Sequence, residues 1–216
     1  INSPSFVQLY SQNNPVGIGD PNLTPEKLAA NEITMSHSVN ENFHWSLALF
    51  QYKAEDLIEY TPNAELKGNL ATNIGTLDGT GGELSFSWKP KRDLSLMANM
   101  SYQDTSVQSG AEVFEAPTFM VSVAANYQIN SNWYWHNNIK WLDARSRQAQ
   151  DVRDELEAYA LVKSGIRYKS EVPGWAYALF IDNLLDEKAA EPSNGHIPDD
   201  YPIPGRRIEF EVAYRF

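Results

Sequence analysis

Apolar and polar residues alternate one by one along most of this chain. The last strand-like segment shows the pattern clearly, because Ile208, Phe210 and Val212 alternate with Glu209 and Glu211. Successive side chains of a β-strand point to opposite faces of a sheet, so strict alternation predicts a strand with one apolar face. Helical spacing fits none of these segments.

The alternation predicts about nine strands. Their expected positions are 27–39, 42–60, 72–89, 93–104, 117–129, 132–143, 156–170, 174–185 and 205–216. Several exceed the ~5–6 residues that are usual in soluble sheets. They match the ~9–11 residues that a tilted strand needs to cross a bilayer.

Short and long connections between the expected strands alternate without exception. Tight turns are expected around residues 40–42, 89–92, 130–132 and 171–174, and the longer polar links at about 10–26, 61–71, 105–116, 144–155 and 186–204. Outer-membrane barrels have short periplasmic turns and long outer loops, whereas a soluble sandwich has no reason to sort its loops by length. The fold class predicted is therefore all-β, a transmembrane antiparallel β-barrel.

Aromatic residues gather next to the short turns. The set comprises Phe43, Trp45, Trp88, Tyr127, Trp133, Trp135, Tyr168, Trp175, Tyr177, Tyr214 and Phe216. Amphipathic rings prefer headgroup depth, so the set is interpreted as one interfacial girdle. The alternative interpretation is a soluble sheet core, which would place aromatics in mid-strand as often as at one end.

Composition excludes several functions. The net charge of −11 argues against general nucleic-acid binding, which needs clustered Lys and Arg, and the chain has no cysteine. Hydrophobic residues make up 42% of the chain, but no stretch approaches the ~20 apolar residues of a membrane-spanning helix. No nucleophile elbow, P-loop or zinc-protease motif is present, so neither catalytic residues nor a cofactor is predicted. The four histidines, His37, His44, His136 and His196, are scattered, and no metal site is expected.

Several short motifs, in matching order, resemble those of TonB-dependent outer-membrane receptors. The first is Pro4–Tyr10 followed by 20–26, which contains Pro21, Leu23, Pro25 and Glu26. The others are Gly82-Glu83, Ala116-Pro117, 158–162, 182–186 with Asn183 and Leu184, and Pro204-Gly205-Arg206 before the terminal Phe216. Gln8 and Asp20 depart mildly from the family pattern. A motif of the haem-receptor subgroup is absent, which disfavours haem uptake.

This resemblance implies a barrel of about 22 strands, filled by an N-terminal plug domain. Residues 1–216 would be the C-terminal part of that barrel, without the plug and the earlier strands. The implied location is the outer membrane of a Gram-negative bacterium. The implied partners are membrane lipid, the rest of the receptor, TonB and an iron chelate or another small nutrient. Iron–siderophore complexes are preferred only because they are the commonest cargo of the family.

Five residues are candidates for ligand contact. Tyr52, Lys140 and Tyr159 have the parity of interior-facing side chains near the outer strand ends, and Arg145 and Arg147 lie just beyond. Arginine suits a bidentate grip on carboxylate or phosphate groups of an anionic chelate. The alternative role for each is hydrogen bonding to a plug domain.

Two other functions remain open at this point. One is a freestanding small barrel with a structural or adhesin role, which the odd strand count opposes. The other is a barrel enzyme, which would need a His/Ser/Asp cluster at the outer rim. Asn137 is an unexplained detail, because it shares the outward parity of Trp135 and Ile139. A subunit contact or a local bulge would account for it.

Overall fold

The computed structural model describes residues 1–12, 17–63, 65–66, 68–107, 116–147, 151–193 and 198–216. The chain forms two compact units. Unit 1 comprises Ile1–Ile33, Leu49–Gly81 and Asp104–Val113, and unit 2 comprises Thr34–Ala48, Gly82–Gln103 and Phe114–Phe216.

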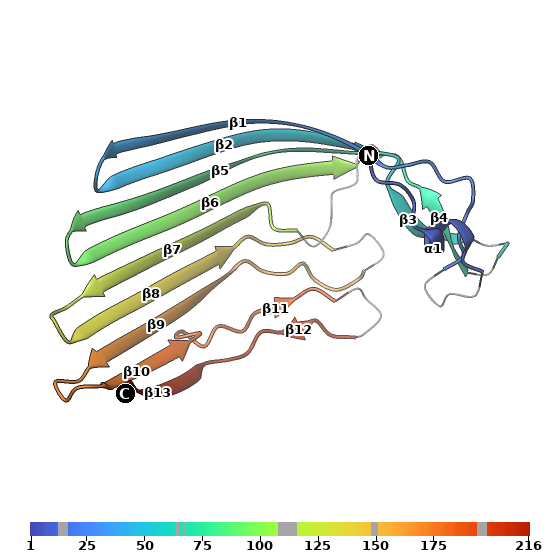
Figure 1. The fold of residues 1–216 in the computed structure, drawn as a ribbon. Helices are drawn as coiled ribbons and strands as arrows, with labels where there is room; N and C mark the ends of the chain where they lie inside the picture. Colours follow the sequence, from blue (N-terminus) through green and yellow to red (C-terminus); the bar gives the residue numbers. More distant parts are fainter. Residues whose placement is uncertain (13–16, 64, 67, 108–115, 148–150, 194–197) are drawn as a thin grey trace. The chain divides into compact units, whose positions relative to one another are not determined.

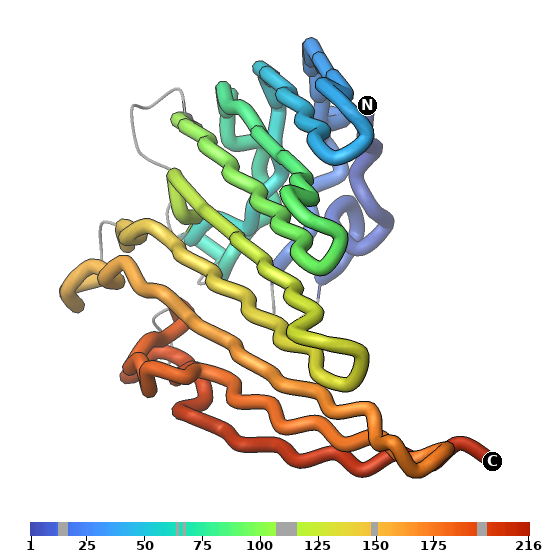
Figure 2. The backbone as a smooth tube through the Cα atoms, turned by 90° about the vertical axis from the view of Figure 1, so that its left-hand side faces the viewer, coloured from blue at the N-terminus to red at the C-terminus, as the bar shows by residue number. Residues whose placement is uncertain are grey.

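Unit 2 is built on one antiparallel sheet of nine strands, all or part of each lying in this unit. The strands are β1 (Lys27–Asn40), β2 (Phe43–Glu55), β5 (Thr76–Lys91), β6 (Leu94–Val107), β7 (Phe119–Gln128), β8 (Trp133–Leu142), β9 (Tyr159–Lys169), β10 (Trp175–Asp182) and β13 (Arg207–Tyr214). They lie side by side in chain order (Figures 1 and 2). The prediction of nine consecutive antiparallel strands is confirmed.

The pairing from β6 to β13 is continuous. In β8, Asn137 lies opposite Ala125 on one side and Ser164 on the other, and the register runs unbroken through all three positions. A bulge needs an extra residue in one strand. Asn137 therefore does not mark a bulge, and its amide lies on the same face as Trp135 and Ile139.

The apolar face of the sheet is largely exposed. Ile208, Phe210 and Val212 of β13 keep 65%, 66% and 49% of their surface accessible. Apolar patches of this kind mark protein or membrane contact, since water does not favour them. Within the described part of unit 2, neither a second sheet nor a helix packs on this face.

Aromatic rings form a continuous chain at the end of unit 2 that carries the short turns. The ring centroids of Trp133 and Tyr168 are 4.7 Å apart, those of Tyr168 and Tyr177 6.4 Å, and those of Trp175 and Tyr214 4.8 Å. Trp133 belongs to β8 and Tyr168 to β9. Trp175 and Tyr177 lie two residues apart on β10, and Tyr214 belongs to β13. The predicted girdle is thus a set of direct contacts across β8, β9, β10 and β13.

A second aromatic group lies at the other end of the same face. The rings of Phe119 and Trp141 are 5.8 Å apart, and Tyr102 pairs with Phe119 across β6 and β7. The expectation of aromatics at one end only was therefore incomplete. Two aromatic levels on one apolar face are typical of the two interfaces of a membrane.

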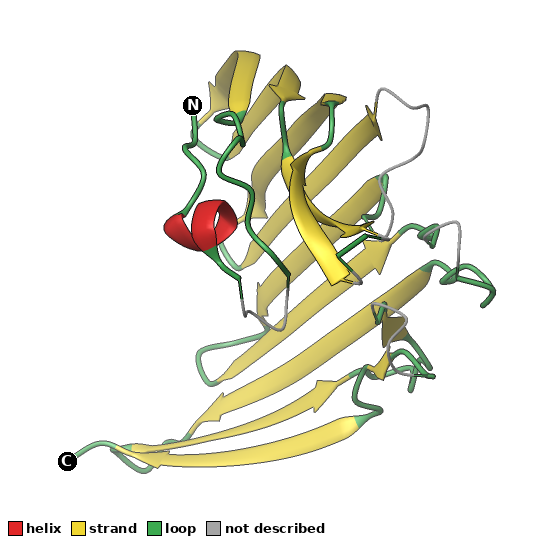
Figure 3. Ribbon diagram, turned by 90° about the vertical axis from the view of Figure 1, so that its right-hand side faces the viewer, coloured by secondary structure: helices red, strands yellow, loops and turns green. Residues whose placement is uncertain are grey.

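Unit 1 contains secondary structure that the sequence pattern did not predict. The helix α1 (Phe6–Tyr10), drawn in red in Figure 3, begins at a capping box in which Ser5 and Gln8 bond each other's backbone N–H. The hairpin of β3 (Ile58–Asn63) and β4 (Gly68–Asn73) occupies most of the predicted link 61–71. No helix in the described residues is long and apolar enough to cross a membrane.

The predicted strand 42–60 was too long. β2 ends at Glu55 because Asp56 adopts a positive φ of 59°, a conformation that breaks a strand. The alternation is interrupted here, because the polar residues Glu55 and Asp56 are adjacent and are followed by the adjacent apolar residues Leu57 and Ile58, so the sequence does carry a sign of the break.

Glu26, one of the family-motif residues, links the segment before β1 to the hairpin of β3 and β4. Glu26 accepts hydrogen bonds from the backbone of Ile58 at 2.9 Å and from the amide of Asn2 at 2.7 Å. Asp20 accepts the backbone N–H of Asn22 at 2.8 Å, a role that an asparagine also performs. The mild departure at Asp20 therefore keeps the local turn.

Candidate functional site

Two long links of unit 2 meet at the end of the sheet opposite the short turns, and their described residues are 143–147 with 151–158 and 183–193 with 198–206. A bridge between Arg145 and Leu156 folds the first link onto itself, and β11 (Ala190–Glu191) pairs with β12 (Tyr201–Pro202) in the second. Between them lies a group of charged side chains, here called the loop cluster. Its members are Arg145, Arg147, Asp151, Arg153, Glu191 and Asp200.

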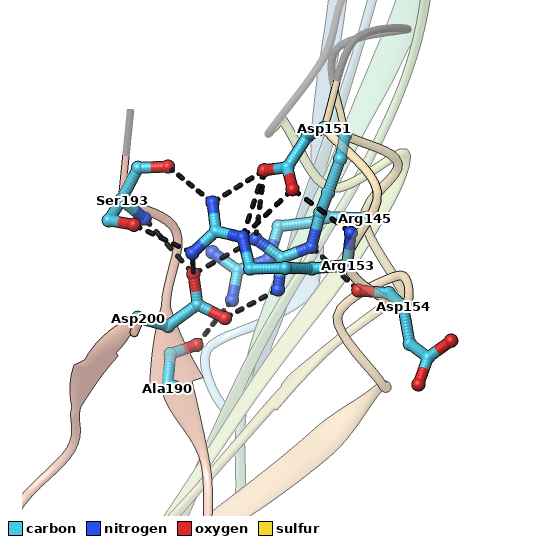
Figure 4. Close-up of polar contacts among 8 residues, drawn as sticks. Arg145, Asp151, Arg153, Asp154, Ala190, Ser193 and Asp200 are labelled. Carbon is cyan, nitrogen blue, oxygen red and sulfur yellow. Dashed lines mark hydrogen bonds and ion pairs between the residues drawn. The ribbon is translucent and has the colours of Figure 1, made fainter. Parts of the chain in front are cut away.

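Asp200 is the centre of the loop cluster. Its carboxylate accepts two hydrogen bonds from the guanidinium of Arg147, one of them at 2.9 Å, and one from Arg153 at 3.0 Å. It also accepts the backbone N–H of Ser193 at 3.2 Å. Arg153 in turn binds Asp151 and the hydroxyl of Ser193 (Figure 4). One carboxylate thus joins two arginines of the first link to the second link.

Arg145 makes a separate connection between the same two links. Its Nη1 donates to Glu191 at 2.6 Å and its Nη2 to the carbonyl of Ala190 at 2.9 Å. The hydroxyl of Tyr159 donates to the other oxygen of Glu191 at 2.7 Å, and the guanidinium lies over the Tyr159 ring at 5.7 Å. Only 3% of Arg145 is exposed. A buried guanidinium is tolerated because it is paired and hydrogen-bonded.

The charges of the loop cluster are balanced. Three arginines face three carboxylates, and side-chain exposure is 8% for Arg147 and 17% for Asp200. Hydrogen bonds from the Arg153 guanidinium lower the pKa of Asp151 to about 2. Those from Arg147 lower the pKa of Asp200 to about 2. Both carboxylates are therefore ionised at neutral pH.

These pKa values predict when the loop cluster comes apart. A carboxylate whose folded pKa lies below its ordinary value of 3.8 stabilises the folded state above that value, and the stabilisation is lost as pH falls towards about 2. We expect amide hydrogen exchange of residues 151–158 and 198–204 to be equally protected from pH 7 to about pH 4.5 after correction for intrinsic rates. Protection should then fall between about pH 4 and pH 2. A loss of protection already near pH 6 would contradict the assignment of these pairs.

The family-motif residue Asn183 closes the second link at its base. It adopts a positive φ of 49°, is 6% exposed, and exchanges hydrogen bonds with the backbone of Glu187 at 2.8 and 3.0 Å. Its amide also donates to the carbonyl of Pro204 at 3.2 Å. Nearby, Asp186 accepts the backbone N–H of Arg206 at 2.9 Å. The two ends of the link are therefore joined just above β10 and β13.

A row of charged side chains crosses the polar face of the sheet below this link. Lys163 of β9 pairs with Asp182 of β10 at 2.8 Å, and Asp182 also pairs with Arg207 of β13 at 2.8 Å. Lys140 lies two residues beyond Asn138, which is opposite Lys163, so all four charged groups share one face. They line a cavity of about 270 Å³ together with Leu161, Ile203 and Pro204. We call it the Lys140 cavity.

Two further hollows adjoin these groups. Lys140 also lines a cavity of about 470 Å³ on the polar face, with Glu83, Ser46 and Ser122. A hollow of about 390 Å³ separates the two long links and is lined by Arg147, Arg153, Tyr159 and several carboxylates. Ligand-sized space is therefore present both on the polar face and between the links.

The five predicted contact residues fall into three places. Arg145, Arg147 and Tyr159 come together around the loop cluster, and Lys140 lines the two cavities of the polar face. Tyr52 lies in unit 1, where its ring covers Gly79 and its hydroxyl lies 3.0 Å from that of Thr105. The role of each residue in ligand contact stays a prediction.

Sequence reasoning missed the partners that organise these places. The five predicted contact residues do not include the following members of these places: Asp151, Arg153, Lys163, Asp182, Glu191, Asp200 and Arg207. Alternation gives the face of Lys163, Asp182 and Arg207, but their pairing depends on register. For the loop residues no pattern in the sequence shows which acid meets which arginine.

Other predicted positions have structural roles or fall outside the described residues. Leu184 donates its backbone N–H to Val162 at 2.8 Å, and the ring of Phe216 lies 5.0 Å from that of Tyr214. A Cβ on Gly205 would lie 3.0 Å from the Asp186 carboxylate. Among the described residues no group of His, Cys, Asp and Glu is arranged to hold a metal, and His196 lies outside them.

Comparison with known proteins gives a consistent result. A model of the family described as TonB dependent receptor-like, beta-barrel, matches residues 1–184. A search of curated protein sequences found no match.

Solved structures are similar over nearly the whole chain. The ferric-catecholate import receptor Fiu of E. coli K12 matches with a TM-score of 0.76 at 16% identity, over 95% of this chain and 30% of its own. The copper transporter OprC matches with 0.76 at 16% identity, over 100% of this chain and 35% of its own. The ferripyoverdine receptor of the outer membrane of Pseudomonas aeruginosa matches with a TM-score of 0.73 at 16% identity, over 89% of this chain and 27% of its own. This chain thus spans about a third of the length of each.

Proposed function

Because this chain belongs to the family of TonB-dependent receptor β-barrels, we propose that it forms the C-terminal part of a receptor that imports a scarce nutrient. The nutrient proposed is an iron–siderophore complex, with energy supplied through TonB. The observation that carries the proposal is the family match over residues 1–184, joined to an antiparallel sheet of nine strands in chain order. Similar structures include an import receptor for ferric catecholate and a receptor bound to ferripyoverdine.

The family and the similar structures are outer-membrane proteins of Gram-negative bacteria, and this chain is one as well. They are receptors and transporters rather than enzymes, which confirms that expectation. The exposed apolar face of β13 and the two aromatic levels fit a sheet that faces lipid.

The sheet has two edges, β1 and β13. Backbone groups left unpaired within lipid are very costly, so membrane sheets close into barrels. We infer that earlier strands of the same receptor pair with both edges, and that a plug domain fills the interior. The long links then lie on the outer side and the short turns in the periplasm.

Within this receptor the five predicted contact residues have different roles. Lys140 has an exposed side chain on the interior face and is available to a ligand. Arg145, Arg147 and Tyr159 are bonded to carboxylates of their own chain, so they act by fixing the shape of the outer mouth. Tyr52 is held against Gly79 as part of the interior wall.

The import function predicts an uptake defect when the receptor is removed. Deleting the gene of the full-length receptor should abolish energy-dependent uptake of at least one iron chelate from a panel of radio-iron complexes. Deleting the TonB gene should remove the same uptake, because outer-membrane import has no energy source of its own. Passive diffusion of small sugars serves as the control and should be unchanged in both strains.

Two results would reject parts of this proposal. Uptake that depends on the receptor but persists without TonB would remove the energy coupling. If no iron chelate depended on the receptor while copper uptake did, the cargo assignment would be wrong and the transport assignment would stand.

A further inference from the structure

The Lys140 cavity carries an excess of positive charge. Its charged lining consists of three cations, Lys140, Lys163 and Arg207, and one anion, Asp182. Two positive charges are therefore uncompensated. A cleft lined by one sign of charge concentrates ions of the opposite sign, most strongly where low-dielectric walls focus the field. The cavity therefore favours an anion.

Asp182 cannot neutralise the third cation as well. One of its oxygens accepts from Lys163 at 2.8 Å, and the other accepts from Arg207 at 2.8 and 3.3 Å. Both oxygens are thus engaged in the two ion pairs. Lys140 makes no hydrogen bond or ion pair with any residue that the structure describes. Its ammonium group remains available for a ligand.

The position of these cations is fixed by strand register. Asn138 lies opposite Lys163 and Asp182 opposite Arg207, so the row is set by backbone pairing and not by flexible loops. Neighbouring strands are ~4.8 Å apart, which places the cations of β8, β9 and β13 along a span of roughly 15 Å. An anion with two or more charged groups can contact more than one of them.

The uncharged part of the lining is mostly apolar, with Asn138 and Asn183 as its polar members. Leu161 and Val162 contribute from β9, and Ile203 and Pro204 from the link above β13. Asn183 and Gly205, two family-motif residues, also line the cavity, where the bond from Asn183 to the carbonyl of Pro204 holds the link in place. A ligand with both charged oxygens and a carbon skeleton suits this combination better than a bare inorganic ion.

We propose that the Lys140 cavity binds an organic anion with at least two negative charges, so that anionic molecules are the substrate class of this receptor. The substrate class rests on the proposed import function, whereas binding in the cavity does not. Contact with Lys140 comes first, because its ammonium group has no competing partner. Lys163 and Arg207 then share their charge between Asp182 and the ligand.

The test measures how an anion protects individual lysines. The full-length protein in outer-membrane vesicles is treated with limiting acetic anhydride, and acetylation of each lysine is quantified by mass spectrometry. Citrate is the anionic probe, because it is a small organic tricarboxylate. Its triethyl ester is the uncharged control, and sodium chloride equalises the ionic strength. We expect citrate to slow acetylation of Lys140 at least threefold and that of Lys163 to a smaller extent.

Two lysines outside the cavity serve as controls, and two variants test the contribution of individual cations. Lys188, whose side chain is 80% exposed in the outer link, and Lys91, at the end of β5 next to a short turn, should be acetylated at the same rate with and without citrate. Lys140→Gln should remove most of the protection of Lys163, and Arg207→Gln should weaken the protection of Lys140. Both replaced side chains are exposed, so neither change should affect assembly.

Equal acetylation of Lys140 with and without citrate would overturn the proposal, as would an equal slowing at Lys188. Protection by the ester would show that charge is not what the cavity recognises, which also overturns it. Protection of Lys140 in a receptor whose deletion changes no uptake would leave the anion site standing and reject the import function. The two failures are therefore distinguishable.

Discussion

Replacing Asp200 with asparagine is expected to release the two outer links from each other. The change removes one charge without changing shape, and it leaves Arg147, whose side chain is 8% exposed, without its main partner. Removing one partner of a buried ion pair costs about 3–5 kcal/mol, and partial exposure of the cluster reduces this to about 2–4 kcal/mol. Since ~1.4 kcal/mol is tenfold in an equilibrium constant, local opening should become roughly 30- to 700-fold more frequent.

Hydrogen exchange followed by mass spectrometry measures this opening. Amides of residues 151–158 and 198–204 should lose protection, while those of β8 and β9 should keep it. Asp199→Asn is the matched control, because the same charge is removed one position away, where the carboxylate makes no hydrogen bond or ion pair with any described residue. If both variants lose protection equally, general loop charge and not the Asp200 pairing holds the links.

Replacing Asn183 with alanine is expected to open the second link at its base. The change removes three hydrogen bonds to the backbone of Glu187 and Pro204, each worth about 1 kcal/mol, and it puts alanine at a φ of 49°. A non-glycine residue in the left-handed region costs about 1 kcal/mol more. The sum is about 3–5 kcal/mol of local stability. Trypsin should then cleave after Lys188 and Arg206 much faster in the purified receptor.

A glycine at the same position separates the two causes. Asn183→Gly keeps the backbone conformation and loses only the side-chain hydrogen bonds, so its cleavage rate should lie between those of the wild type and Asn183→Ala. Cleavage after Lys91 provides an internal reference. Should Asn183→Gly behave like the wild type, the amide bonds contribute little and the conformation alone makes asparagine suitable.

The spanning strands were predictable because a membrane sheet leaves a direct trace in the sequence. In β13, every second residue from Ile208 to Tyr214 faces lipid, and the residues between them face the interior. Apolar and polar side chains are therefore required at alternate positions along the strand. The predicted positions of β6, β7, β8, β9, β10 and β13 agree with the structure to within a few residues at each end. Strand ends were less accurate, and the predicted strand 42–60 was extended across the interrupted alternation at residues 55–58, where β2 in fact ends.

The short elements of unit 1 were missed for a different reason. The helix α1 has one clear signal, the Ser5 and Gln8 capping box, but at five residues it lacks an apolar periodicity. The hairpin of β3 and β4 is rich in polar residues, and its strands have six residues each. Such elements are stabilised by contacts with distant segments, among them the two hydrogen bonds that the side chain of Asn73 exchanges with the backbone of Thr24.

For this protein, the sequence by itself determined the all-β class, the order of the strands, the two faces of each strand and the family. These properties follow from the period of the side chains and from local motifs, and both are local in the chain. Only the tertiary structure decided which charges meet. Arg147 and Asp200 are 53 residues apart, and Asp182 lies between Lys163 and Arg207 through strand register alone. Ion pairs act through space over a few ångströms, so the distance between two residues along the chain does not indicate which of them will pair.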